Sequence, residues 1–333
     1  MTSYEIYNNI LITGGCGFIG SHFINQYYQK INSNIINIDA LYNCSNKENI
    51  SEHIRNDTKR YLLYPIKLQN LEFVSHILEI HNINQVIHFA AQSHVQNSFE
   101  SSLQFTDDNV FGTHVLLEAC RKYGKIKKFI HCSTDEVYGE TSISDSDTKK
   151  ESSSLLCPTN PYAASKAAAE LFAISYWKSF KLPVIITRGN NVFGPNQYPE
   201  KVIPKFIDQL FNNKQITIQG DGSAVRGFLY IDDVVSAFIT VLNKGVIGEI
   251  YNIGSDDSNE ISISELAKLL ISKIVPKKED AIKYIDDRPF NDHRYYISSS
   301  KLRDLGWKPE TKFVDGLDKV IESYMKKNFK YFD

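Results

Sequence analysis

The chain has 333 residues, of which 42% are hydrophobic and 23% are charged, a composition typical of a globular protein. Its 37 basic and 39 acidic residues give a formal net charge of −2, which argues against a general nucleic-acid-binding protein. No apolar run reaches the length of a membrane span, and the first residues lack the charged and apolar regions of a secretory signal.

The cysteines and histidines bear on compartment and metal binding. None of the cysteines forms a C-x-x-C pair, which predicts reduced thiols and a cytoplasmic protein. The nine histidines contain no metal-binding motif, so no metal is predicted. The five cysteines are Cys16, Cys44, Cys120, Cys132 and Cys157.

The first half of the chain alternates short apolar runs with helical patterns. Strands are predicted at residues 9–13, 34–39, 62–66, 85–90, 128–133 and 182–188. Helices are predicted between them at residues 18–30, 71–81, 101–123 and 162–180. This alternation predicts an α/β fold, a doubly wound parallel sheet of the Rossmann type with helices on both faces.

The pattern changes after residue 188. Gly, Pro and Asn cluster at residues 189–200, which indicates a loop. Helices are then predicted at residues 204–213, 232–244, 262–274 and 315–327, with short strands among them. Because no flexible linker is visible, we expect a Rossmann domain at 1–188, with return segments near 228–254. A smaller mixed α/β lobe is expected at 189–333, packed directly on that domain.

A glycine-rich sequence lies between the first predicted strand and helix. Gly15, Gly17 and Gly20 fit G-x-G-x-x-G, and Gly14, Gly17 and Gly20 fit G-x-x-G-x-x-G. Such glycines let the backbone approach a pyrophosphate, whose charge the helix N-terminus accepts. The alternative is a tight turn that binds no ligand.

An acidic residue follows at the spacing expected for a ribose ligand. Asp39 ends the second predicted strand about 20 residues beyond the glycines. A carboxylate there accepts hydrogen bonds from the ribose hydroxyls and repels a 2′-phosphate, so NAD is favoured over NADP. The alternative is an Asp that only caps a helix or a turn.

Two further patterns indicate proton transfer. Tyr162 and Lys166 form Y-x-x-x-K on a predicted helix, so that the ammonium group can lower the pKa of the phenol and make it a base. Thr134, Asp135 and Glu136 follow a predicted strand at the sheet edge where ligands bind, and two carboxylates suit an acid and a base. The alternatives are an ordinary solvated helix face and a surface turn.

Together these motifs resemble one family. TGGCGFIG, AAQSHVQNSF, STDEVYGE, NPYAASK, GNNVFGPNQYPEK, GDGSAVRGFLYIDDV, YNIG and DRPFNDHRY occur in this order from residue 13 to 296. The chain resembles the extended short-chain dehydrogenase/reductases, and within them the nucleotide-diphosphate-glucose 4,6-dehydratases. Stretches such as LLCPTNPYAASKAAAE look closer to the UDP-glucose dehydratase domain of eukaryotic rhamnose synthases than to bacterial dTDP-glucose enzymes.

The resemblance implies a three-step reaction. Tyr162, supported by Lys166 and Thr134, takes the proton of the sugar 4-hydroxyl while hydride passes from C4 to NAD. Glu136 then removes the C5 proton, and Asp135 protonates the departing 6-hydroxyl. Hydride returns to C6, which gives a 4-keto-6-deoxy sugar nucleotide and regenerates a tightly bound NAD.

The resemblance also implies ligand contacts. Arg226 and Arg288 suit a diphosphate, because a guanidinium group matches phosphate geometry. The implied substrate contacts are His94, Thr134, Asn190, Lys201, Arg226, Asn252, Arg288 and Asn291. The implied cofactor contacts are Gly14, Gly17, Phe18, Ile19, Gly20, Asp39, Ala90, Asn109, Tyr162, Lys166 and Asn191. The 189–333 lobe is thereby expected to bind mainly the sugar nucleotide.

One position departs from the family pattern. Relatives carry an Asp after the third strand that holds the adenine amino group, whereas this chain has Lys67. This departure predicts weaker retention of NAD. No catalytic group is lost.

Three other functions remain as alternatives. A sugar-nucleotide 4-epimerase needs no elimination pair, so Asp135 and Glu136 argue against it, and the NADP preference of GDP-mannose 4,6-dehydratase conflicts with Asp39. A non-catalytic NAD-binding protein is the third. By analogy a homodimer is expected through the helices at 101–123 and 162–180. The sequence leaves UDP-glucose and dTDP-glucose undecided.

Overall fold

The computed structural model describes residues 9–142, 148–152, 155–255 and 259–328. The first eight residues, which entered the expectation about a secretory signal, therefore lie outside the described part. None of the helices in the described ranges is long and apolar enough to cross a membrane.

The chain divides into two compact units. The first comprises Met1–Thr134, Pro161–Arg188 and Val235–Tyr251. The second comprises Asp135–Asn160, Gly189–Val234 and Asn252–Asp333.

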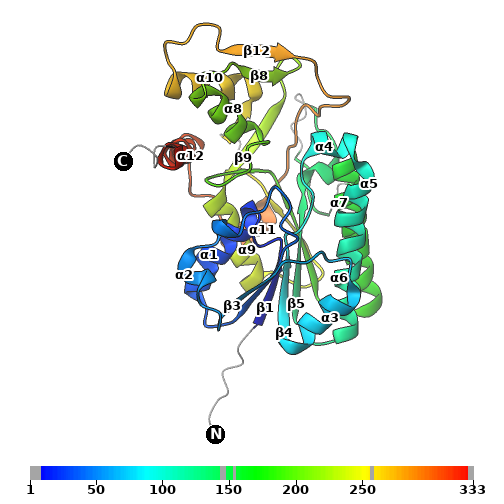
Figure 1. Cartoon of the computed structure of the whole chain (residues 1–333). Coiled ribbons are helices and arrows are strands. Elements are labelled where there is room, and N and C mark those ends of the chain that lie inside the picture. Colours follow the sequence, from blue (N-terminus) through cyan, green and yellow to red (C-terminus); the bar gives the residue numbers. More distant parts are fainter. Residues whose placement is uncertain (1–8, 143–147, 153–154, 256–258, 329–333) are drawn as a thin grey trace. The chain divides into compact units, whose positions relative to one another are not determined.

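A seven-stranded sheet with strand order β10-β6-β5-β4-β1-β2-β3 forms the centre of the first unit (Figure 1). The pairings among β3, β2, β1, β4 and β5 are all parallel, which confirms the predicted doubly wound sheet. Its strands are β1 (Asn9–Thr13), β2 (Ile35–Ile38), β3 (Tyr61–Tyr64), β4 (Ile83–His88), β5 (Lys128–Thr134), β6 (Val184–Gly189) and β10 (Ile250–Ile253).

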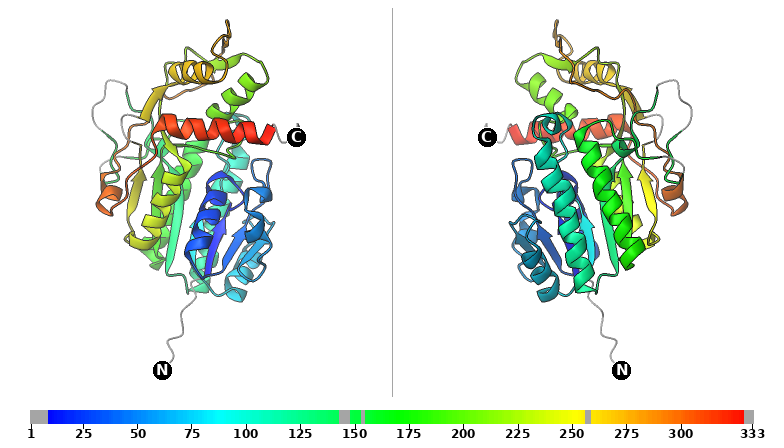
Figure 2. Two further views of the ribbon diagram at one scale, coloured as in Figure 1. Left: turned by 90° about the vertical axis from the view of Figure 1, so that its left-hand side faces the viewer. Right: turned by 90° about the vertical axis from the view of Figure 1, so that its right-hand side faces the viewer.

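Helices cover both faces of this sheet. On one face lie α3, α6 and α7, and the right-hand view of Figure 2 shows α6 and α7 side by side. On the other face lie α1 and α9. The helices are α1 (Phe18–Tyr27), α2 (Glu52–Arg55), α3 (Leu71–Ile80), α4 (Val95–Glu100), α5 (Ser102–Phe105), α6 (Gly112–Tyr123), α7 (Pro161–Phe180) and α9 (Ile231–Lys244).

The apolar strands explain why the sheet is buried. Leu11 and Phe129 point into a core with Val74 and Leu116 from α3 and α6. On the opposite face the Phe89 ring lies 5.7 Å from that of Phe23 and 4.8 Å from that of Phe238, between centroids. Burying such side chains contributes roughly 1.5–3 kcal/mol each.

The helix predicted at residues 101–123 is not continuous. Between α5 and α6, Thr106–Phe111 form a π-helical turn, and Asn109 within it is buried. A π-turn shifts the side chains of the following residues by about one position, which the apolar periodicity does not reveal. This turn aims Asn109 into the first unit.

The second unit contains a three-stranded sheet, β11-β9-β7, and a two-stranded parallel pair, β12 and β8. In the larger sheet β7 and β9 are parallel, whereas β11 runs antiparallel to β9. The strands are β7 (Asn191–Phe193), β8 (Ile216–Gln219), β9 (Val225–Tyr230), β11 (Glu260–Ser262) and β12 (Ile282–Ile285). The helices are α8 (Val202–Phe211), α10 (Ile263–Ile274), α11 (Ser300–Asp304) and α12 (Phe313–Asn328).

Residues 135–160, which the sequence analysis assigned to the first domain, group with the second unit. Long-range hydrogen bonds explain this grouping: Asn190 bonds Asp135, Thr159 bonds Asp292, and the Thr141 N–H donates to the Arg294 carbonyl at 2.9 Å. The segment leaves the main sheet at the end of β5 and returns at the start of α7.

Candidate active site

The glycine loop joins β1 to α1 in the first unit. Gly14 has φ +71°, and a Cβ there would lie 2.6 Å from the Ala90 nitrogen. A Cβ on Gly20 would lie 2.3 Å from the Gly14 oxygen. Both glycines are therefore required by the turn itself, because any side chain would collide with backbone. Gly17 is less crowded, with its nearest neighbour at 3.2 Å.

The N-terminus of α1 is suited to an anion. Gly17 is the N-cap and makes no side-chain capping bond, and the first turn, which opens with Phe18 and Ile19, contains no acidic residue. The main-chain N–H groups and the positive end of the helix dipole are thus not neutralised by a side chain. This arrangement fits the pyrophosphate of a dinucleotide.

Asp39 connects the glycine loop to the end of β2. One carboxylate oxygen accepts the Cys16 N–H at 2.8 Å, and the other accepts the Leu41 N–H at 2.8 Å. The side chain is 4% exposed. Asp39 therefore holds the loop, and each carboxylate oxygen has a second lone pair that can accept a ribose hydroxyl.

Asn109 ties the loop after β4 to α7. Its amide accepts the Gln92 N–H at 2.7 Å and donates to the Gln92 carbonyl at 2.9 Å and to Ser165 Oγ at 2.9 Å. Ser165 in turn donates to the Tyr162 carbonyl at 2.7 Å. Asn109 thereby positions the segment that contains Ala90, and its predicted direct contact with a cofactor stays a prediction.

Tyr162 and Lys166 lie one turn apart on α7, and both are buried. Lys166 donates to the Cys132 carbonyl at 2.6 Å, which directs the ammonium group to the end of β5. Burial lowers the pKa of Lys166, whereas the charge of Glu170 raises it.

Two buried histidines lie near Lys166 in the first unit. Burial lowers the pKa of His88 to about 3 and that of His131 well below its ordinary value, and the charge of Lys166 lowers both further. Both imidazoles are therefore neutral at pH 7 and add no positive charge beside Lys166.

Thr134 is the last residue of β5, and Asp135 and Glu136 open the 3-10 turn that follows (Asp135–Tyr138). Asp135 is 1% exposed and accepts a hydrogen bond of 2.6 Å from the Asn190 amide. Glu136 is half-buried and accepts a bond of 3.2 Å from the Asn160 amide. The two adjacent carboxyl groups thus have different partners.

The pKa of Glu136 is raised. Burial is the main cause, and the Asp292 carboxylate acts in the same direction. The Asn160 amide, Lys201 and Arg226 oppose the shift. A carboxyl group with a raised pKa takes up a proton more readily than an ordinary Glu, which suits a role in proton transfer.

Two guanidinium groups lie together in the second unit. Arg226 on β9 donates to the carbonyls of Asp292, at 2.8 Å, and His293, at 3.2 Å. Arg288 shares the Asn291 side-chain oxygen with Arg226, and its pKa is lowered by burial and by the charge of Arg226. The Arg288 Nε is buried without a hydrogen-bond partner among the described residues. Two like charges and an unsatisfied donor form a place for an anion.

The remaining predicted site residues are dispersed over several elements. His94 is the N-cap of α4, Lys201 is the N-cap of α8, and Asn191 is the first residue of β7. Asn252 is fully buried in β10, and its side-chain amide bonds Tyr138, the Lys149 carbonyl and the Ser298 carbonyl. The side chain of Asn252 thus makes these hydrogen bonds within the protein. Its contact with substrate stays a prediction.

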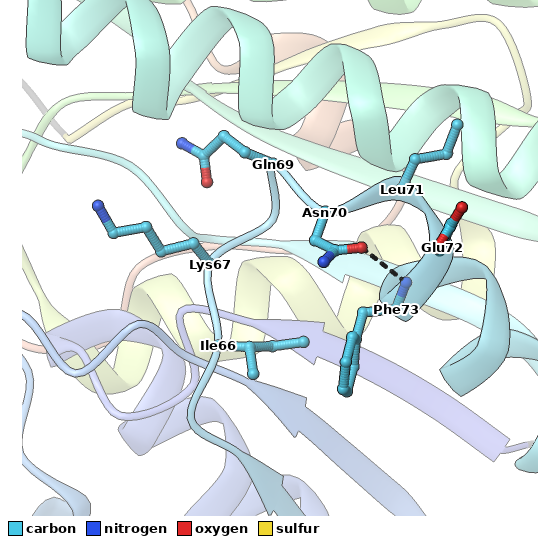
Figure 3. A pocket seen from close by; sticks show the side chains of 7 residues that line it. All are labelled: Ile66, Lys67, Gln69, Asn70, Leu71, Glu72 and Phe73. Carbon is cyan, nitrogen blue, oxygen red and sulfur yellow. Dashed lines mark hydrogen bonds between the residues drawn. The ribbon is translucent and has the colours of Figure 1, made fainter.

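Lys67 lies at the edge of a surface pocket between β3 and α3 (Figure 3). The lining residues are Ile66, Lys67, Gln69, Asn70, Leu71, Glu72 and Phe73. The Lys67 ammonium lies 5.1 Å from the centre of the Tyr42 ring, and interaction with Tyr42 raises its pKa. A cation therefore stands where the family pattern has a carboxylate.

Four residues of this region were not predicted from the sequence: Thr159, Asn160, Asp292 and Tyr295. Thr159 donates to both Asp292 oxygens, at 2.7 and 3.0 Å, and the Tyr295 hydroxyl also donates to Asp292. All four lie within the NPYAASK and DRPFNDHRY stretches or directly before them. Those stretches mark them as candidates, but no local pattern pairs residues 133 positions apart.

Sequence comparison places this chain among sugar-nucleotide enzymes. Residues 11–320 match the family model described as GDP-mannose 4,6 dehydratase. The chain is 46% identical to the dTDP-D-glucose 4,6-dehydratase of Dictyostelium discoideum, over 97% of this chain and 82% of that protein. It is 45% identical to a trifunctional UDP-glucose 4,6-dehydratase/epimerase/reductase of Arabidopsis thaliana, over 95% of this chain but only 47% of that longer protein.

Solved structures show the same architecture. The dTDP-glucose 4,6-dehydratase of Streptomyces venezuelae, crystallised with NAD and TYD, has a TM-score of 0.90 at 34% identity and covers 98% of this chain and 99% of its own. A UDP-glucose 4-epimerase of Thermotoga maritima, with UDP-glucose, has a TM-score of 0.86 at 30% identity and covers 96% and 99%. By sequence and fold, the chain belongs to the GDP-mannose 4,6-dehydratase family, among relatives that are nucleotide-diphosphate-glucose 4,6-dehydratases.

Proposed function

We propose that this protein is an NAD-dependent hydro-lyase that converts UDP-glucose or dTDP-glucose into the 4-keto-6-deoxy sugar nucleotide and water, in deoxysugar biosynthesis of the rhamnose type. The observation that carries the proposal is the Thr134-Asp135-Glu136 sequence at the end of β5, where each carboxyl group accepts a hydrogen bond from a different amide. A 4-epimerase needs no elimination pair.

The cofactor is assigned mainly to the first unit. The glycine loop, the N-terminus of α1 and Asp39 suit the pyrophosphate and the adenosine ribose, and the similar dehydratase from Streptomyces venezuelae was crystallised with NAD. Bound NAD accepts a hydride and returns it in each turnover. The assigned cofactor residues are Gly14, Gly17, Phe18, Ile19, Gly20, Asp39, Ala90, Asn109, Tyr162, Lys166 and Asn191.

Tyr162 is assigned the first proton transfer. Its phenolate takes the proton of the sugar 4-hydroxyl while hydride leaves C4. Lys166 stabilises the phenolate by its charge, since the two side chains share one face of α7. Thr134 holds the same hydroxyl.

Glu136 and Asp135 are assigned the elimination. The 4-ketone acidifies the C5 proton, which Glu136 removes, and Asp135 donates a proton to the departing 6-hydroxyl. When hydride returns to C6, C5 regains a proton, so that the sum of all the steps is the loss of one water molecule from the substrate. Their different partners support two different roles for the adjacent carboxyl groups.

The second unit is assigned the nucleotide diphosphate. Arg226 and Arg288 are assigned to bind the diphosphate. The unsatisfied Arg288 Nε supports this assignment. The other proposed substrate contacts are His94, Thr134, Asn190, Lys201, Asn252 and Asn291. In terms of the two units, NAD is assigned mainly to the first (Met1–Thr134, Pro161–Arg188 and Val235–Tyr251) and the sugar nucleotide mainly to the second.

We also propose a cytoplasmic homodimer. Its interface is assigned to α5, the π-turn and α7, where large apolar side chains are exposed: Leu103 (83%), Phe111 (50%), Leu171 (59%) and Phe180 (52%). Light scattering at micromolar concentration will give a dimer mass, and Leu171→Glu will give a monomer. A monomer mass for the unaltered chain contradicts the proposal. None of the five cysteines, all of which lie in the described ranges, forms a disulfide, which suits a reducing compartment.

The proposed activity is tested by incubating the purified chain with UDP-glucose and dTDP-glucose separately and following water loss by mass spectrometry. A 4-keto-6-deoxy product from either substrate is expected, and the ratio of the two kcat/KM values identifies the preferred nucleotide. Formation of the galactose epimer without water loss would contradict the assignment of Asp135 and Glu136.

A further inference from the structure

Asp292 lies in the middle of a buried hydrogen-bond chain in the second unit. We propose that Asp292 is a positioning residue that holds the base Glu136 in place through Thr159 and Asn160. The inference rests on the proposed function, because it takes Glu136 as the group that removes the C5 proton.

Asp292 is buried and accepts hydrogen bonds at both carboxylate oxygens. Its carboxyl group is 3% exposed and accepts hydrogen bonds from two hydroxyl groups, those of Thr159 and Tyr295. Thr159 reaches both carboxylate oxygens, at 2.7 and 3.0 Å. Hydroxyl donors directed at both oxygens match an ionised carboxylate, which is an acceptor only. The charge is thus held within a preorganised set of donors.

Thr159 is connected to Glu136 through Asn160. Asn160 follows Thr159 directly in the chain, and its side-chain amide donates to Glu136 at 3.2 Å. The peptide unit between Thr159 and Asn160 therefore connects the hydrogen bond from Thr159 to Asp292 with the hydrogen bond from Asn160 to Glu136. Releasing Thr159 from Asp292 frees the backbone that carries Asn160.

The main chain of Asp292 contacts a residue that is assigned to the diphosphate. Arg226 donates to the Asp292 carbonyl at 2.8 Å, and its guanidinium carbon lies 5.0 Å from the centre of the Tyr295 ring. Arg288 and Asn291 belong to the same short segment, residues 288–295. The segment assigned to the substrate diphosphate thus also carries the residue that positions the base.

The charges around Glu136 predict a change in pH dependence that tests the role of Asp292. Lys201, Arg226 and Arg288 face Glu136 with positive charge, while Asp292 faces it with negative charge and Tyr295 with its hydroxyl. The negative charge of Asp292 raises the pKa of Glu136. Its removal therefore extends the ionised form of Glu136 to lower pH, in addition to loosening its position.

Two substitutions separate the effect of Asp292 on the position of Glu136 from the effect of the Asp292 charge on the pKa of Glu136. Asp292→Asn removes the charge and weakens the bond to Thr159, whereas Thr159→Val removes the bond and keeps the charge. Asp221→Asn, in an exposed loop of the same unit where the carboxylate accepts hydrogen bonds from Ser223, is the matched control. Each full-length variant is mixed with the sugar nucleotide in deuterated buffer in a single turnover. Absorbance reports NADH formed by C4 oxidation, and mass spectrometry reports deuterium exchanged at C5.

We expect Asp292→Asn and Thr159→Val to slow C5 exchange by roughly tenfold or more, part of what a positioned general base contributes, while C4 oxidation stays near the wild-type rate. The acid limb of kcat moves to lower pH in Asp292→Asn and not in Thr159→Val. Asp221→Asn behaves as wild type. The proposal is overturned if Asp292→Asn slows both steps by the same factor, if it slows neither, or if the acid limb stays in place.

Failure of the proposed function gives a different result. Glu136→Gln, run in the same assay, tests the role of Glu136 directly. If the unaltered enzyme forms no dehydrated product, the proposed function fails, and if Glu136→Gln leaves C5 exchange intact, Glu136 is not the base. If Glu136→Gln abolishes exchange and Asp292→Asn does not change it, only the positioning role is wrong.

Discussion

Asn160 donates its side-chain amide to Glu136 at 3.2 Å across 24 residues of sequence, and Asn160 directly precedes Pro161, the first residue of α7. Glu136 is therefore tied to the chain segment that leads into the helix carrying Tyr162. Continuity along the chain also joins Thr134 to Asp135 and Glu136. The groups assigned to oxidation and to elimination thus lie on the same two short segments.

Substituting Glu136 by Gln should separate the two half-reactions. The amide has nearly the same shape but cannot accept the C5 proton, so C4 oxidation continues and water loss stops. We expect dehydration to fall by about a hundredfold or more, with NADH still formed in a single turnover. Unchanged dehydration would remove Glu136 from its assigned role.

The pH dependence should reflect the raised pKa of Glu136. As a base, Glu136 must be ionised, and burial raises its pKa above the ordinary value of 4.5. The rate of C5 proton removal should therefore decline as the pH falls through a midpoint above 4.5. An acid limb that lies below this value, measured as C5 exchange against pH, would show that Glu136 is solvated in the working enzyme.

The main sheet was predictable because its information is local. The β1 strand at Asn9–Thr13 has the predicted bounds, and α7 begins one residue before the prediction, at Pro161. Continuous apolar strands separated by amphipathic helices leave few topologies for a parallel sheet. The positions of Gly14, Gly20 and Asp39 follow from the same βαβ geometry.

The features that could not be predicted depend on contacts between residues far apart in the sequence or on the backbone hydrogen bonding of successive turns. The π-turn at Thr106–Phe111 has the same apolar pattern as an α-helix, so only the structure reveals that Asn109 points inward. The pairing of Thr159 with Asp292 joins residues 133 positions apart. Neither periodicity nor motif spacing contains that information. The antiparallel β11 is likewise too short to be read from alternation.

Lys67 should weaken retention of NAD. An ammonium group only donates hydrogen bonds, so it cannot accept one from the adenine amino group. The freshly purified enzyme should carry less than one NAD per chain, and Lys67→Asp should raise the occupancy, measured by absorbance after denaturation. Lys30→Asp, also on the surface of the first unit, is the control. Full occupancy of the unaltered enzyme would contradict this prediction.

Breaking the buried ion pair of Arg188 and Glu170 should strongly destabilise the fold. The two groups are 2.6 Å apart with side chains only 3% and 0% exposed. Glu170→Gln leaves a buried guanidinium without its counter-charge, so the free energy of unfolding should fall by about 3–5 kcal/mol. Urea denaturation followed by circular dichroism measures this change. Glu322→Gln, which breaks the exposed pair with Lys326, should change little, and equal effects of both variants would contradict the prediction.

One active site should oxidise C4, eliminate water and reduce C6 without releasing the hydride. A sugar nucleotide labelled with deuterium at C4 tests this sequence of steps. We expect a 4-keto-6-deoxy product with the deuterium at C6 and one water molecule lost. Deuterium retained at C4 of an epimer, or a product with no label at C6, would contradict it.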